Sequence, residues 1–251
     1  MLIINADDIG RCKNATDRAI TCYRKERITS ISAMVYMEDS ERAADLATSA
    51  GIDVGLHINL SENFTGDTAS TRLRDDQDRI CRFLGRSKYA LLFYNPYLRS
   101  QFRYVFQAQY EEFIRLYGQP PSHMDGHFHM HLASNMLIDR VIPYGTNVRR
   151  NFTFALAEKG FFNRFYRHIV DSWLQRRYRL TNYFFGLLQY DFARLENIII
   201  KLANTANVEL MTHPQVPEEY NLLMSDEYGH AISKVSLGNY ATFQYPYAIT
   251  N

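Results

Sequence analysis

The chain has 251 residues, of which 46% are hydrophobic, and its formal net charge is +1 at pH 7. This length and composition suit a single domain with a substantial apolar core. A charge so close to zero predicts no electrostatic field strong enough to bind nucleic acid or an anionic membrane surface. We therefore expect one globular domain over residues 1–251, with neither nucleic acid nor a membrane as its partner.

The cysteine content and the N-terminal residues indicate the cellular location of the protein. Cys12, Cys22 and Cys81 are odd in number and lack Cys-x-x-Cys spacing, which argues against a disulfide framework and a cysteine-based zinc site. The chain opens on an apolar, strand-like run at residues 2–4. Neither the charged segment nor the long apolar segment of a signal peptide precedes this run. No apolar run is long enough to span a bilayer. The expected location is the cytoplasm.

The first half of the chain alternates strand-like and helix-like patterns. Short apolar or β-branched runs predict strands at residues 2–6, 29–36, 53–60 and 122–129. Amphipathic segments between them predict helices at residues 14–25, 39–50, 97–117 and 134–142. Because alternating strands and helices form parallel βαβ units, the sequence predicts an α/β fold with its functional site at the carboxyl ends of the strands.

The second half is less regular. Residues 147–150 fit a short strand, 151–190 a helical excursion with loops, 192–203 a helix and 208–212 a strand. A basic run interleaved with aromatic residues starts here, and it comprises Arg149, Arg150, Lys159, Arg164, Arg167, Arg176, Arg177 and Arg179. Such a run can bind nucleic acid, but the near-neutral chain favours a solvated excursion or a subunit contact.

Carboxylates and histidines mark the ends of four predicted strands. Asp7 and Asp8 follow the first strand, His57 lies in the third, and His213 follows the strand at 208–212. Each has a simpler explanation when taken alone: a surface turn that caps the next helix for the aspartates, a buried hydrogen-bonded side chain for His57, and a loop for His213. A nearby cation would offset the repulsion between the two aspartates.

The densest signal is the stretch 123–131, which contains four of the eight histidines. If the strand persists, Asp125, His127, His129 and His131 share one face. They would then span about 20 Å, which is too far for one ion to bind all of them. If the segment turns helical after His127, His127 and His131 form an i, i+4 pair, which is also a metal-binding geometry. The roles of His129 and His131 stay open.

This combination of side chains suits metal-assisted hydrolysis. Two histidines and one carboxylate leave coordination positions for water and a substrate oxygen. A second carboxylate can take the proton of that water, and a further histidine can protonate the leaving group. The sequence contains no Gly-x-Gly-x-x-Gly, Walker-type or Gly-x-Ser-x-Gly motif, so dinucleotide, ATP and serine-hydrolase functions lose support.

Together the four stretches resemble the motifs of the YdjC-like carbohydrate deacetylases, which include the chitooligosaccharide deacetylases. The matching stretches are residues 5–10, 55–60, 123–131 and 209–214. The resemblance implies a distorted TIM-barrel-like (β/α) barrel related to that of the polysaccharide deacetylases. It also implies a divalent metal ion, magnesium or zinc, and removal of the acetyl group from an N-acetylated amino sugar or short oligosaccharide.

Residue by residue, the resemblance implies that Asp8, His57 and His127 bind the metal. Asp7 would be the base that activates water, and His213 the acid that protonates the amine. Asp125 would orient a neighbouring side chain.

The stretches 61–95, with its acidic Asp75-Asp76-Gln77-Asp78, and 151–190 match no family motif, and we expect both to shape the sugar site. The alternatives are a metal-dependent hydrolase of a phosphoester or another amide, and a non-catalytic homologue that binds a sugar or a cation. A homodimer is a further candidate.

Overall fold

The computed structural model describes residues 1–154, 160–189, 192 and 195–243, with the side chains of residues 161–164 and 189 outside the description. A parallel sheet with the strand order β4-β3-β2-β1-β6-β5 forms its centre, and β7 pairs with the start of β1. Its strands are β1 (Leu2–Ile9), β2 (Ser30–Ala33), β3 (Asp53–Ile58), β4 (Met124–Gly126), β5 (Tyr183–Gly186), β6 (Val208–Thr212) and β7 (Leu237–Gly238).

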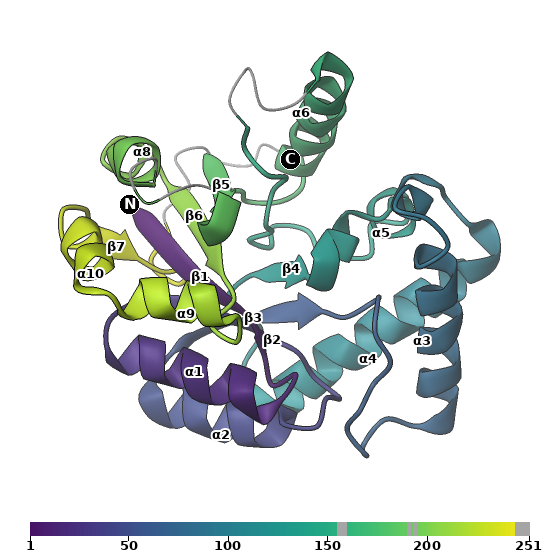
Figure 1. Ribbon diagram of the computed structural model, residues 1–251. Helices are drawn as coiled ribbons and strands as arrows, with labels where there is room; N and C mark the ends of the chain where they lie inside the picture. The colour runs from purple at the N-terminus through teal and green to yellow at the C-terminus, as the bar shows by residue number, and fades with distance from the viewer. Residues whose placement is uncertain (155–159, 190–191, 193–194, 244–251) are drawn as a thin grey trace.

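The sheet curls into a half-barrel, which Figure 1 shows with helices along its outside. Residues 147–153 lie between the two edge strands. The backbone N–H of Met124 in β4 donates to the carbonyl of Asn147 at 2.8 Å, and the N–H of Thr153 donates to the carbonyl of Phe184 in β5 at 2.8 Å. The predicted α/β barrel is therefore confirmed in a distorted form. The expected strand at 147–150 is reduced to two isolated bridges.

The α-helices are α1 (Lys13–Arg24), α2 (Ser40–Ala50), α3 (Thr71–Leu84), α4 (Arg99–Tyr117), α5 (Ser134–Ile138), α6 (Phe161–Gln175), α8 (Lys201–Ala203), α9 (Pro217–Met224) and α10 (Asp226–Ile232). Short 3₁₀ helices span Ala90–Leu92, Pro96–Leu98, His127–Leu132 and Leu187–Gln189, and a π-helix spans Leu195–Ile200. Two helices end as the sequence predicts. Gly51 after α2 and Gly118 after α4 adopt left-handed φ values of 66° and 70°, which close the last helical turn.

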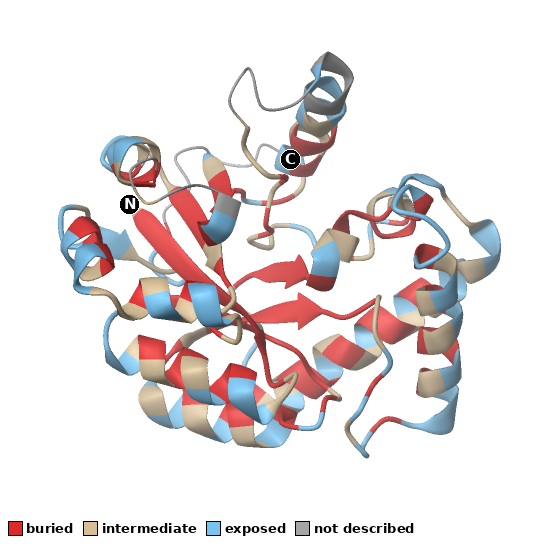
Figure 2. Cartoon of the chain, viewed as in Figure 1, coloured by how far each residue is buried: buried red, intermediate tan, exposed pale blue. Residues whose placement is uncertain are grey.

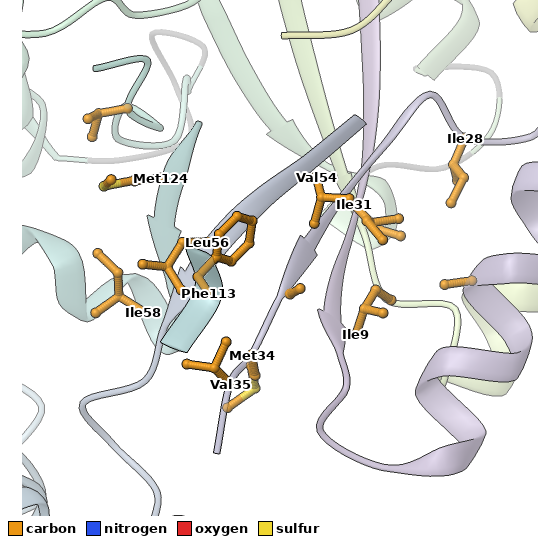
Figure 3. Packing of buried hydrophobic residues seen from close by; sticks show 14 of the residues in the cluster. Ile9, Ile28, Ile31, Met34, Val35, Val54, Leu56, Ile58, Phe113 and Met124 are labelled. Atoms are coloured by element: carbon orange, nitrogen blue, oxygen red, sulfur yellow. The ribbon is translucent and has the colours of Figure 1, made fainter. Parts of the chain in front are cut away.

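The sheet is buried, and the helices are buried only along the side that faces it (Figure 2). Parallel strands covered by helices read as nearly continuous apolar runs, and β2, β3 and β6 are buried along almost their whole length. In Figure 3, Phe113 of α4 lies beside Leu56 of β3. Burial of a large side chain such as Phe113 contributes about 1.5–3 kcal/mol to stability.

Several elements differ from the prediction. The stretch 61–95 contains α3, whose apolar Leu73, Ile80 and Leu84 are buried and whose charged residues had obscured the helical pattern. Within the predicted excursion at 151–190, the structure has α6 and β5, and residues 155–159 lie outside the description. In the predicted helix 192–203, the described part is the π-helix followed by α8. Among the described residues, no helix combines the length and apolar character needed to cross a bilayer.

Candidate metal centre and active site

The four marked stretches meet at the carboxyl ends of β1, β3, β4 and β6. A cleft of about 450 Å³ opens there. It is lined by Asp7, Asp8, Arg11, His57, Gly126, His127, Phe128, His129, Met211, His213, Gln215 and Val216. The five residues to which the resemblance assigns metal binding or proton transfer are all among these. Residues separated by more than 200 positions are thus brought together by the topology of the sheet.

Asp8, His57 and His127 form a group that could hold a metal ion. Their potential ligand atoms lie within 4.8 Å of one another, and all three residues are buried. The Oδ1 atom of Asp8 lies 3.1 Å from Nε2 of His57 and 2.8 Å from Nδ1 of His127. Both are ion-pair contacts, but neither has the geometry of a hydrogen bond, so this buried oxygen has no hydrogen-bond partner. An orphaned carboxylate oxygen that faces two imidazole nitrogens fits a divalent cation, which would satisfy all three atoms.

The backbone of Asp8 explains how two adjacent aspartates reach one cleft. In a regular strand, Asp7 and Asp8 would point to opposite faces. Here the pairing of β1 with β2 shifts register between Ala6 and Ile9, and Asp8 has a left-handed φ of 68°. Such a bulge re-aims a side chain, and left-handed strain in a non-glycine residue is typical of functional sites.

The field at the centre favours positive charge. Burial would raise the pKa of Asp8, but nearby His127 and His57 outweigh burial and hold that pKa below its usual range. Burial would likewise lower the pKa of His57, but the carboxylates of Asp125 and Asp7 prevail and raise it to about 10. A field that retains a proton on a buried imidazole would also attract a cation.

Both imidazoles have a carboxylate partner on the side away from Asp8. His57 Nδ1 lies 2.8 Å from Oδ1 of Asp125, and His127 Nε2 lies 3.2 Å from Oε1 of Glu62. A carboxylate behind a histidine fixes the ring orientation and leaves the other nitrogen for the metal. The resemblance anticipated an orienting role for Asp125. Glu62, held by two hydrogen bonds from Arg11, carries no sequence signal of its own.

Arg149 is the largest omission of the sequence analysis. Its guanidinium is completely buried and donates to both carboxylate oxygens of Asp7, at 2.6 and 2.8 Å. It also contacts Asp125 and Glu209, each at 2.6 Å. Burial would lower the pKa of Arg149, but Asp125, Asp7 and Glu209 raise it well above its usual value.

For Arg149, the expectation of a solvated or subunit-contact position is therefore wrong. The segment that joins β4 to β5 places this residue inside the half-barrel. Its neighbour in the basic run, Arg150, also has internal partners, because it binds Asp171 and the carbonyl oxygens of Thr181 and Asn182. Lys159 and the side chain of Arg164 lie outside the described part of the chain.

His213 lines the same cleft and follows β6 directly. Its backbone N–H donates to Oε2 of Glu219 at 2.6 Å, and its Nδ1 lies 3.4 Å from Oε1 of the same residue. Burial would lower the pKa of His213, but Glu219 and Asp7 outweigh burial and raise it. His213 is therefore more readily protonated than a free imidazole. Glu219 belongs to α9, which the sequence analysis did not predict.

The remaining histidines of the 123–131 stretch have other partners. The strand ends at Gly126, so the extended alternative is wrong, and a 3₁₀ helix follows. His131 does not join His127 in either group of converging ligand atoms among the described residues, and its Nε2 lies 3.0 Å from the carbonyl oxygen of Arg149. His129 makes an edge contact with Phe152, at 4.7 Å between ring centroids. His123 hydrogen-bonds Ser32 and Ser122.

The fold and site together define an α/β half-barrel protein with an Asp-His-His group in a cleft at the strand ends. Comparison with known proteins identifies the family. The chain matches the family described as "YdjC-like protein" over residues 1–238, and it belongs to that family.

Relatives with related names align with much of the chain. It is 26% identical over 230 residues to a chitooligosaccharide deacetylase of Proteus mirabilis, covering 85% of this chain and 81% of the relative. A carbohydrate deacetylase of Xenopus laevis is also 26% identical, over 255 residues, with 86% and 81% coverage. A carbohydrate deacetylase of Danio rerio is 32% identical over 139 residues, and this match spans 54% of the chain and only 43% of the relative.

The fold has a counterpart among solved structures. A crystal structure from Enterococcus faecalis, described as that of a cellobiose-phosphate cleavage protein, superposes with a TM-score of 0.64. The superposition covers 96% of this chain and 97% of that chain at 18% sequence identity, and it supports the fold alone.

Proposed function

We propose that the protein is a metal-dependent hydrolase that removes the acetyl group from an N-acetylated amino sugar or a short, chitooligosaccharide-like oligosaccharide. The observation that carries this proposal is the meeting of an Asp-His-His group with Asp7 and His213 in one cleft. The names of the relatives agree with a carbohydrate deacetylase. The cytoplasmic location, the single-domain boundary and the homodimer stay predictions.

In this proposal, Asp8, His57 and His127 hold one divalent ion, zinc or magnesium. Two imidazole nitrogens suit zinc, and a carboxylate oxygen suits either ion. When bound, such an ion supplies positive charge that polarises an amide carbonyl and makes water more acidic. The residues around it carry the proton transfers.

Asp7 accepts the proton of the attacking water. Arg149 holds both oxygens of its carboxylate, and the amide of Asn5 donates to Oδ1 at 2.9 Å, so the group has one fixed orientation. The water oxygen forms a bond to the acetyl carbon, and the C–N bond then breaks. His213, kept protonated by Glu219, donates its proton to the departing amine nitrogen. The products are acetate and a free amino sugar.

A two-metal phosphoesterase is less consistent with the geometry. Asp7, His57 and Asp125 also bring potential ligand atoms within 4.8 Å of one another. The guanidinium of Arg149, however, contacts both of these carboxylates at 2.6–2.8 Å. A fixed cationic side chain already neutralises this second group, whereas two-metal sites use such carboxylates to bind the second ion.

The test is Asp7→Asn. We expect the variant to bind one divalent ion per chain like the wild type, while acetate release from diacetylchitobiose falls at least 100-fold, since it lacks the general base. Asp17→Asn, on the exposed side of α1, is the matched control and should keep full activity. A fully active Asp7→Asn variant would refute the role of Asp7. Loss of metal together with activity would reassign Asp7 to the ligand set.

A further inference from the structure

Phe128 is an aromatic side chain whose placement the proposed reaction does not explain. It follows the metal-ligand candidate His127 directly, and it lines the cleft. Its side chain is 66% exposed, in contrast to the fully buried Phe102 and Phe113 of the core. Its ring centroid lies 4.3 Å from that of His127, with a tilt of 51° between the planes. The exposed ring therefore stands at the mouth of the cleft, beside the candidate metal centre.

The backbone that presents this ring is strained. Phe128 and His129 have φ values of 50° and 58°, both in the left-handed region, and they interrupt the 3₁₀ helix that follows β4. Left-handed φ values are unfavourable for residues with a Cβ, and two in succession are rare. Glycine or asparagine would relieve the strain at Phe128. Burial does not compensate for it, because most of the ring is exposed to solvent.

A strained and exposed residue at a cleft points to a ligand contact. Most of the residues that line the cleft have polar side chains, including Asp7, Asp8, His57 and His127, and Phe128, Met211 and Val216 are its large apolar residues. A pyranose ring has one face dominated by C–H groups, and that face needs an apolar surface while its polar groups meet the base of the cleft. Phe128 supplies a flat apolar surface of this kind.

We propose that Phe128 is the stacking platform for the sugar ring and thereby a determinant of substrate specificity. This inference rests on the proposed function, because the sugar that stacks on Phe128 is the one whose N-acetyl group reaches the metal centre. Phe128 takes no part in proton transfer. It acts by binding the ring and setting its distance from Asp7 and His213.

The test compares KM and kcat for acetate release from diacetylchitobiose. Phe128→Ala should raise KM about tenfold or more and change kcat much less, whereas Phe128→Trp should keep a KM near that of the wild type. Phe128→Asn separates the ring from the backbone. Asparagine tolerates the left-handed conformation, so this variant should fold well and still show the raised KM. Tyr97→Ala is the matched control, because Tyr97 is also an exposed aromatic residue but does not line the cleft.

A second measurement detects binding without turnover. In the Asp7→Asn background, saturation-transfer NMR should show contact between aromatic protons and the sugar C–H groups, and Phe128→Ala should remove most of it. If the wild type releases acetate and Phe128→Ala has an unchanged KM, the platform is refuted while the deacetylase stands. If the wild type releases no acetate but binds the sugar through Phe128, the platform stands and the reaction is wrong. If the protein neither releases acetate nor binds the sugar, the deacetylase and the stacking role of Phe128 are both refuted.

Discussion

Replacement of Arg149 by methionine is the most informative perturbation of the site's framework. The change keeps the length of the aliphatic side chain and removes a guanidinium that contacts Asp7, Asp125 and Glu209 at 2.6–2.8 Å. All four groups are buried. The variant would therefore leave three carboxylates inside the half-barrel without their shared cation.

The expected loss of stability follows from this geometry. Removal of one partner of a buried ion pair costs about 3–5 kcal/mol, because the other charge stays uncompensated. With three carboxylates affected, we expect on the order of 5 kcal/mol, which is comparable to the whole stability of a marginal domain. Protonation of a buried carboxylate limits this loss of stability. Burial already raises the pKa of Glu209 to about 7 despite Arg149, and without Arg149 it would rise further.

The loss should therefore depend on pH. A carboxylate whose pKa is raised in the folded state favours folding while it is protonated, and this contribution is lost as the pH rises through the folded pKa. The Arg149→Met variant should accordingly be destabilised more at pH 8 than at pH 6.

The assay is urea unfolding at both pH values, with Arg150→Met as control. Arg150 is partly buried and pairs with the single carboxylate of Asp171. The Arg150→Met variant should therefore lose less than half as much stability as Arg149→Met. A loss below about 1 kcal/mol for Arg149→Met, or equal losses at both pH values, would refute this account of the network.

Three further predictions concern single side chains. Glu219→Gln removes the partner that raises the pKa of His213. The alkaline limb of the kcat–pH profile should therefore move to lower pH. An alkaline limb at the wild-type position would rule out His213 as the acid. Glu62→Gln should weaken divalent-metal binding about 10–100-fold in a competition titration, because Glu62 supports His127, and unchanged affinity would show that it has no such role. Burial lowers the pKa of His123 to about 4, so its contribution to stability is present above pH 6.5 and lost as the pH falls from 6.5 to 4. His123→Gln should reduce the slope of unfolding free energy in that window by up to about 1.4 kcal/mol per pH unit, and an unchanged slope would contradict the buried neutral histidine.

Much of the fold follows from local patterns. The strand at 208–212 has the predicted limits, and helices α2 and α4 end at the predicted residues 50 and 117, each just before a glycine. These patterns are legible because buried parallel strands are continuously apolar and a left-handed helix end favours glycine. Because the carboxyl ends of parallel strands lie at one edge of the sheet, the strand pattern predicts that Asp8, His57 and His127 lie close together. The structure does bring these three residues together.

The remainder of the site depends on long-range geometry that no local pattern encodes. In the sequence, nothing distinguishes Arg149 from the other arginines of the basic run. Its burial depends on the path of the segment between β4 and β5, which places it inside the half-barrel. The left-handed φ of Asp8 and the turn after Gly126 arise from tertiary contacts that override strand propensity. Glu219 escaped notice because the short helix α9 was not predicted.

The central claim is a metal-dependent deacetylase, and acetate release tests it most directly. Purified protein is incubated with diacetylchitobiose, with and without a chelator, and then with zinc or magnesium restored. The account predicts acetate release that the chelator abolishes and one of the two ions restores. Acetate release that persists in the chelated protein, or none from the folded protein with its metal bound, would contradict it.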